Sequence, residues 1–72
     1  MPLTLTVNGE TRVLDPAPDP TSLAAVMALL ASNPQLVVAE HNGVIAPRSR
    51  WDSIVVKDDD TLEIVTIVGG GS

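Results

Sequence analysis

Polar and apolar residues alternate at the start of the chain, where threonines separate Leu3, Leu5 and Val7. A period of two is typical of a strand with one buried face. The next pair, Asn8-Gly9, favours a type I′ turn, because both central residues of that turn need positive φ. Residues 11–14 then return as a second strand, so the pattern predicts an N-terminal hairpin.

The spacing changes to that of a helix in the next segment. Residues 15–20 contain three prolines and predict an extended connector, because proline has no N–H to donate. Apolar residues then recur at i, i+3, i+4 and i+7, which places on one helical face Leu23, Val26, Met27 and Leu30. Thr21 or Ser22 is the expected N-cap and Asn33-Pro34 the expected end, which gives a helix of about three turns.

Two short apolar runs form a predicted second hairpin. Residues 36–39 are apolar on both faces, which favours a central position in the sheet. Residues 40–43 end in Asn-Gly and predict the turn, and residues 44–46 form the next strand, which Pro47 ends.

A polar connection and one more strand complete the chain. Residues 48–53 predict a connection with a helical turn, residues 54–56 return to an apolar pattern, and residues 57–60 predict a turn. The β-branched run within residues 61–68 predicts a buried last strand. The order β-β-α-β-β-β indicates an α+β fold with a mixed sheet of four to five strands and one helix packed on one face.

Length and composition narrow the class of protein. Seventy-two residues make one domain, which we place at residues 1–68, with a flexible glycine tail at residues 69–72. The core is expected to be aliphatic, because Trp51 is the only aromatic residue. One histidine, no cysteine and no convergent carboxylate pair offer no catalytic constellation and no thiolate metal site, so we expect neither an enzyme nor a metalloprotein.

The net charge and the hydropathy of the chain indicate which partners it can bind and in which compartment it is expected. The formal net charge of −5 argues against the basic footprint of a nucleic-acid or anionic-membrane binder. The apolar runs are shorter than a membrane span, and the N-terminus lacks a signal-peptide pattern, so a cytoplasmic protein is expected.

The glycine tail at Gly69, Gly70 and Gly71 has no side chains to pack, which predicts a fixed strand followed by a free end. A tail of this kind threads into a narrow slot and delivers its terminal carboxylate there. A carboxylate becomes an electrophile only after activation, which implies a partner that uses a nucleotide and a nucleophile that follows. A flexible linker has the same composition, so these residues alone leave both interpretations open.

One helix covers only one face of the sheet, so the other face of the last strand is expected to be exposed. Leu62 and Ile64 alternate with Val65 and Ile67, and either pair forms an apolar patch at the root of the tail. The predicted partner-docking residues are therefore Leu62, Ile64, Val65, Ile67 and Val68.

Four other features have simpler explanations. Trp51 is expected to be a packing anchor beneath its loop, with partner contact as the alternative. Arg48 and Arg50 are expected to be solvated charges, and His41 has no second histidine or cysteine with which to bind a metal. Residues 58–60 lack the spacing and the distal glutamate of a calcium loop, so we interpret them as a hairpin turn.

The whole pattern resembles the sulfur-carrier proteins of thiazole (thiamin) biosynthesis, the ThiS family of the ubiquitin-like β-grasp superfamily. The segments that carry the resemblance are the Asn8-Gly9 hairpin with the helix after it, Glu40-His41-Asn42-Gly43-Val44-Ile45, Pro47-Arg48-x-x-Trp51, Asp58-Asp59-Asp60 and Ile64-Val65-x-x-Val68-Gly69-Gly70-Gly71. They cover nearly the whole chain, and they favour a functional tail over a linker because the family ends in glycines.

The resemblance implies a mechanism in which this chain is a substrate. An E1-like adenylyltransferase uses ATP and Mg to adenylate the carboxylate of Gly71, after Gly69 and Gly70 have threaded into its slot. A persulfide from a cysteine desulfurase pathway displaces AMP and leaves a thiocarboxylate, which donates its sulfur to thiazole synthase. Ser72 departs from the pattern, so we expect it to be trimmed or to be artificial.

Related functions remain open at this point. A sister carrier has the same chemistry with another acceptor, such as molybdopterin, cysteine or a siderophore-type product. A ubiquitin-like modifier uses the same glycine to form isopeptide bonds with lysines. A plain interaction domain has an inert tail.

Overall fold

The computed structural model describes residues 1–31, 33 and 36–67. Along the chain its elements are β1 (Leu3–Val7), β2 (Glu10–Leu14), α1 (Leu23–Leu30), β3 (Val37–His41), β4 (Val44–Ala46), the short 3-10 helix η2 (Arg48–Arg50) and β5 (Thr61–Thr66). This is the predicted order of strands and helix.

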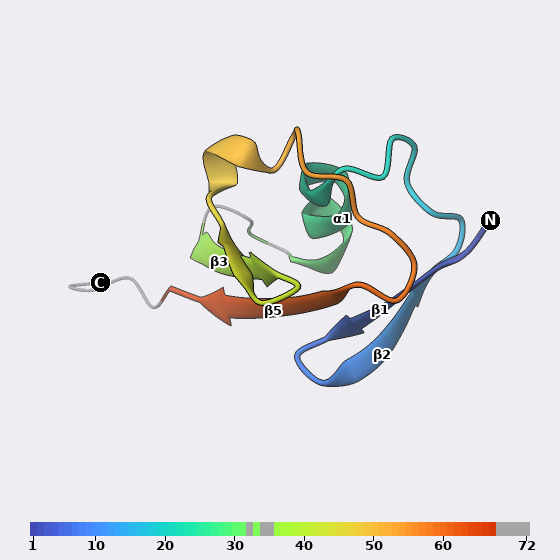
Figure 1. Ribbon diagram of the computed structural model, residues 1–72, viewed down its shortest axis with the longest axis horizontal. Helices are drawn as coiled ribbons and strands as arrows, with labels where there is room; N and C mark the ends of the chain where they lie inside the picture. Colours follow the sequence, from blue (N-terminus) through green and yellow to red (C-terminus); the bar gives the residue numbers. More distant parts are fainter. Residues whose placement is uncertain (32, 34–35, 68–72) are drawn as a thin grey trace.

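The strands form one mixed sheet in the order β2-β1-β5-β3-β4. The outer pairs are antiparallel hairpins, β3 and β5 are antiparallel, and β1 and β5 run parallel. Helix α1 packs across one face of this sheet, as Figure 1 shows. The predicted α+β fold is confirmed with five strands. β3 is paired on both sides, as expected, but β5 occupies the middle of the sheet.

Both Asn-Gly pairs form the turns that the sequence predicts. Asn8 and Gly9 have φ of 52° and 81°, and Asn42 and Gly43 have φ of 52° and 83°. The second turn is shorter than predicted, because Glu40 belongs to β3 together with His41. Pairing with β4 on one side and β5 on the other extends the strand up to the turn.

Helix α1 begins where predicted and ends early. The Ser22 Oγ accepts a hydrogen bond from the Ala25 N–H at 3.1 Å, so Ser22 is the N-cap. The helix has eight residues, slightly more than two turns, and the predicted three turns ending at Asn33-Pro34 are wrong. The chain leaves the helix at Ala31, which is extended (φ −114°, ψ 127°) while its N–H still bonds to the Met27 carbonyl.

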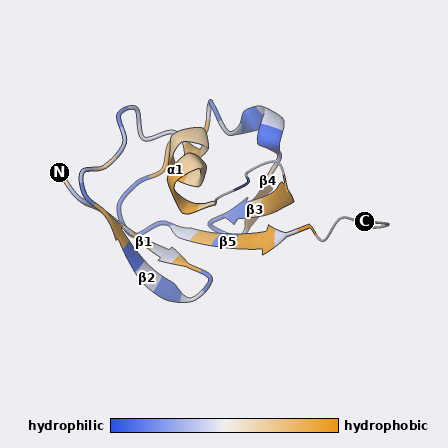
Figure 2. Cartoon of the chain, turned by 180° about the vertical axis from the view of Figure 1, so that it is seen from behind, coloured by the Kyte–Doolittle hydropathy of each residue, from blue (hydrophilic) through white to orange (hydrophobic). Residues whose placement is uncertain are grey.

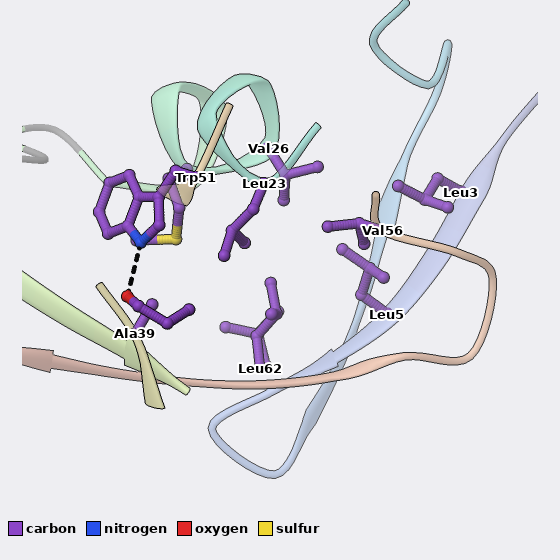
Figure 3. Close-up of a cluster of buried hydrophobic side chains, with 11 residues drawn as sticks. Leu3, Leu5, Leu23, Val26, Ala39, Trp51, Val56 and Leu62 are labelled. Carbon is purple, nitrogen blue, oxygen red and sulfur yellow. Dashed lines mark hydrogen bonds between the residues drawn. The ribbon is translucent and has the colours of Figure 1, made fainter. Parts of the chain in front are cut away.

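The core lies between α1 and the sheet (Figure 3). Its largest fully buried side chains come from the helix, from the strands and from the segment before the acidic turn: Leu5, Leu23, Val26, Met27, Val56 and Leu62. Three of the four apolar residues predicted for the helical face are buried, and Leu30 packs at the edge of the core. Each such side chain contributes about 1.5–3 kcal/mol when it is fully buried.

Trp51 closes one end of this core, directly after η2. Its side chain is 4% exposed, and its Nε1–H donates to the Ala46 carbonyl at 2.8 Å. The predicted packing anchor is therefore confirmed, and it ties η2 to the end of β4 (Figure 3).

Candidate functional site: the open sheet face and the C-terminal strand

Both hairpin turns hold β5 through their asparagine side chains. The Asn8 Nδ2 donates to the Ile64 carbonyl at 3.1 Å, and the Ile64 N–H donates to the Asn8 Oδ1 at 2.7 Å. At the other end of β5, the Thr61 N–H donates to the Asn42 Oδ1 at 2.8 Å. The strand that leads to the tail is therefore fixed from both sides.

The sequence indicated the turns but not these side-chain bonds. The turn needs only positive φ, which aspartate also tolerates. An asparagine amide adds a donor beside an acceptor, so Asn8 pairs with both backbone groups of Ile64 as another strand would. The feature of the sequence that could have indicated these bonds is the presence of asparagine, and not aspartate, at both turns.

The structure shows which apolar side chains of the C-terminal strand face the helix and which face the open side of the sheet. Leu62 is fully buried under α1, and Ile64 is half-buried against the core. Val65 and Ile67 are 63% and 49% exposed on the face that the helix leaves open. The prediction that Leu62 forms part of a docking surface is wrong, because its side chain belongs to the core.

Two residues from neighbouring strands extend the exposed pair into a patch. Val38 lies opposite Val65 in the ladder between β3 and β5 and is 40% exposed, and Ile45 of β4 is 65% exposed. We call Val38, Ile45, Val65 and Ile67 the open-face patch. The sequence did not identify Val38 and Ile45, because their runs are apolar on both faces.

The end of the patch nearest the tail is slightly hollowed. A depression of about 270 Å³ reaches from three residues of the patch to the neighbouring end of the core, and its lining is Val38, Ile45, Ile67, Val37, Ala46, Pro47, Arg48 and Trp51. Arg48 and Arg50 are exposed. The surface thus offers apolar contact with a cation at its rim, an arrangement that suits a protein partner.

The acidic turn after η2 has a structural function. The His41 Nε2 and Asp60 Oδ2 lie 2.7 Å apart, and the same Asp60 oxygen accepts the Lys57 N–H at 2.8 Å. The Asp58 Oδ1 accepts the Thr4 N–H at 2.7 Å. The Asp60 N–H bonds to the Lys57 carbonyl at 3.1 Å, so the predicted turn is present, but β5 pairs with β1 and β3 and the turn does not close a hairpin. Within the described ranges no group of three or more metal-ligating side chains occurs. His41, to which the sequence assigned no function, joins β3 to this turn.

These contacts change the acidity of Asp60. Partial burial raises the pKa of this carboxyl group, but hydrogen bonds from the Lys57 N–H and from the His41 and Asn42 side chains outweigh it. The pKa of Asp60 is therefore lower than its ordinary value.

Five residues of the predicted site lie outside the described residues. They are the activation residue Gly71, the threading residues Gly69 and Gly70, the docking residue Val68, and Ser72. The same holds for the boundary placed between domain and tail. The last described residue, Ile67, belongs to the open-face patch. In the part of the chain that the structure describes, no helix has the length and hydropathy needed to cross a bilayer.

A helix across a five-stranded mixed sheet, with parallel first and last strands at its centre, defines this chain as a ubiquitin-like β-grasp domain. The ThiS family model matches residues 5–71, and the chain belongs to the ThiS family. The crystal structure of thiamine biosynthesis protein ThiS from Geobacter metallireducens superposes with a TM-score of 0.77 and 32% identity, over 96% of this chain and 100% of that one.

Two further relatives match this chain over different shares of their length. A thiazole synthase from Paramagnetospirillum magneticum is 35% identical over 68 residues, which are 94% of this chain and 20% of that protein. The uncharacterized protein ycf40 from Trieres chinensis is 46% identical over 39 residues, which are 54% of this chain and 53% of that protein. The matches thus span about a fifth and about half of these relatives.

Proposed function

We propose that this chain is a sulfur carrier for thiazole formation in thiamin biosynthesis, with Gly71 as the residue that carries the sulfur. The observation that carries the proposal is the position of β5. This strand is clamped in the middle of the sheet, exposes Val65 and Ile67 beside each other, and continues in sequence into three glycines. Membership of the ThiS family supports the same function.

The chemistry follows from the terminal carboxylate. Its oxygen attacks the α-phosphorus of ATP, with Mg bound by the activating enzyme, and pyrophosphate leaves. The terminal sulfur of a persulfide then attacks the carbonyl carbon and AMP leaves, which forms an acyl disulfide. A thiol reduces the S–S bond and releases the thiocarboxylate, a far better nucleophile than the carboxylate that it replaces.

The partners perform the catalysis in this scheme. An E1-like adenylyltransferase activates the tail, a cysteine desulfurase pathway supplies the persulfide, and thiazole synthase accepts the sulfur. The relative named thiazole synthase supports the last partner, because its matching segment is part of one longer polypeptide. This chain contributes the tail and the surface that presents it.

The open-face patch is the proposed docking surface for the activating enzyme. Its exposed side chains are aliphatic and lie beside the strand that leads to the tail, so an enzyme that covers them receives the tail in one direction. Leu62 and Ile64 act from the other side of the sheet, where they hold β5 in place.

Intact mass measurement tests the proposal. A chain that ends at Gly71, without Ser72, is purified and incubated with the activating enzyme, ATP, Mg and a persulfide donor. The expected product ends at Gly71 and carries sulfur in place of one oxygen. A matched variant that also lacks Gly71 is expected to gain no sulfur. If the chain ending at Gly71 is neither adenylated nor sulfurated, the carrier function is refuted, and isopeptide-linked adducts recovered from cells would instead indicate a protein modifier.

A further inference from the structure

Two carboxylates face each other on the open side of the sheet. Glu40 of β3 lies directly opposite Glu63 of β5 in the antiparallel ladder. Both side chains point away from the helix, because the preceding residues Ala39 and Leu62 are fully buried and side chains alternate along a strand. Residues opposite each other have Cβ atoms about 4.5–5.5 Å apart, and like charges at this separation destabilise a sheet.

Within the described residues, no salt bridge joins Glu40 or Glu63 to a basic side chain. Arg48 lines the depression beside Val38 and Ile45 but makes no salt bridge to the pair. The sequence has four basic residues, and none occupies a strand position on the open side. Arg12 lies opposite the buried Leu5 and so belongs to the helix side of the sheet, and the other three lie in η2 and in the turn before β5. The contact between a carboxylate and a basic side chain that is found among the described residues joins Asp60 to His41 instead.

The pair borders the open-face patch. Ile45 lies opposite Glu40 on β4, and Val38 and Val65 are the next outward residues on β3 and β5. Glu40 is already half-buried and Glu63 is exposed. A partner that covers the patch removes water from both carboxylates, and unpaired charges in such a place are strongly unfavourable. A docking partner must therefore bring a cation to this position.

We propose that the E1-like activating enzyme docks on the open face by inserting an arginine between Glu40 and Glu63, with apolar side chains around it that cover the open-face patch. A guanidinium group presents five donors in a planar fork and bridges two acceptors, whereas a lysine ammonium is a compact point charge. The pair then sets the position of the partner along β5 and so the direction in which the tail enters. This inference rests on the proposed carrier function and adds the chemistry of its docking surface.

Glutamine variants test the inference. Glu40→Gln and Glu63→Gln keep the size of the side chain and remove the charge. Each is expected to raise the Kd for the purified activating enzyme by about tenfold. Glu10→Gln is the matched control, because it removes the same net charge from an exposed residue opposite the buried Val7, on the helix side of the sheet. Its Kd is expected to stay at the wild-type value.

Unfolding in urea provides the second measurement. Because the carboxylates repel each other, Glu40→Gln and Glu63→Gln are expected to be at least as stable as Glu10→Gln. A lower midpoint for either variant would show that the carboxylate is held by the fold itself, which overturns the inference. Loss of binding to thiazole synthase, with binding to the activating enzyme unchanged, overturns it as well.

The experiments distinguish failure of the arginine inference from failure of the proposed carrier function. If the glutamine variants bind the activating enzyme like the wild type, while the wild type still becomes a thiocarboxylate, the arginine inference fails and the carrier function stands. If the wild type is not adenylated at all, the proposed function fails whatever the variants do.

Discussion

At the scale of single residues, Asn8 both forms the first hairpin turn and binds the backbone of Ile64, and only the first of these functions is visible in the sequence. Positive φ in the Asn-Gly pair was predictable from the residue types alone. The pairing of its amide with Ile64 was not, because the two residues are 56 positions apart and meet only in the folded sheet. Local turn chemistry is therefore readable from sequence, whereas long-range hydrogen bonds of the same side chain are not.

Replacing Asn8 separates these two functions. Asn8→Gly keeps positive φ but removes both hydrogen bonds to Ile64, so we expect a loss of about 1–2 kcal/mol in the free energy of unfolding. Hydrogen exchange of the Ile64 amide is expected to become faster. Asn42→Gly is the matched control and should expose the Thr61 amide instead. An unchanged Ile64 exchange rate in Asn8→Gly would contradict the clamp.

The lowered pKa of Asp60 predicts a pH dependence. Since the folded pKa lies below the unfolded value, the stabilisation is complete above the unfolded pKa of about 3.9 and is lost as pH falls through the folded value. Asp60→Asn is therefore expected to cost about 1–2 kcal/mol at pH 7 and to approach the wild type only as the pH falls through the folded pKa of Asp60. Urea midpoints across this range provide the test, with the exposed Asp59→Asn as control. Parallel curves for Asp60→Asn and wild type would refute it.

At the scale of elements, periodicity predicted the buried face of α1, and the apolar patterns predicted the order of the five strands, although β3 extends two residues beyond its predicted end. It placed the end of the helix too late, because no residue between Leu30 and Pro34 is a strong helix breaker in sequence. The observed end at Ala31 reflects the path to β3, which is a tertiary constraint. The expected function of Trp51 was confirmed, but its partner Ala46 was not predictable.

A ring substitution tests how Trp51 fixes η2. Trp51→Phe keeps an aromatic ring and removes the indole donor, which leaves the buried Ala46 carbonyl without that bond. We expect a loss of about 1–3 kcal/mol, measured by urea unfolding followed by circular dichroism. Val44→Ala, at a position of the same hairpin that is 68% exposed, is the control and should stay within about 0.5 kcal/mol of wild type. Equal stability of Trp51→Phe and wild type would show that packing alone holds the segment.

At the scale of the whole molecule, the sheet has one face toward the helix and one face open. Figure 2 shows apolar segments on β3 and β5 as well as on α1. The sequence could not orient β5, because Leu62 and Val65 both belong to apolar positions and a shift of one residue in register exchanges the faces. The pairing of Val7 with Leu62 fixes that register, and it is set by the fold of the whole chain.

This two-sided sheet predicts opposite effects for two residues of β5. Leu62→Ala leaves a cavity in the core and is expected to cost about 2–5 kcal/mol, a large share of the stability of a domain of this size. Val65→Ser is expected to change stability by less than about 1 kcal/mol but to weaken binding to the activating enzyme about tenfold. Val13→Ser is the matched control, since Val13 is 57% exposed on the same open face but lies on the edge strand β2. If Val13→Ser weakens binding as much as Val65→Ser does, the docking surface is not the patch at the root of the tail.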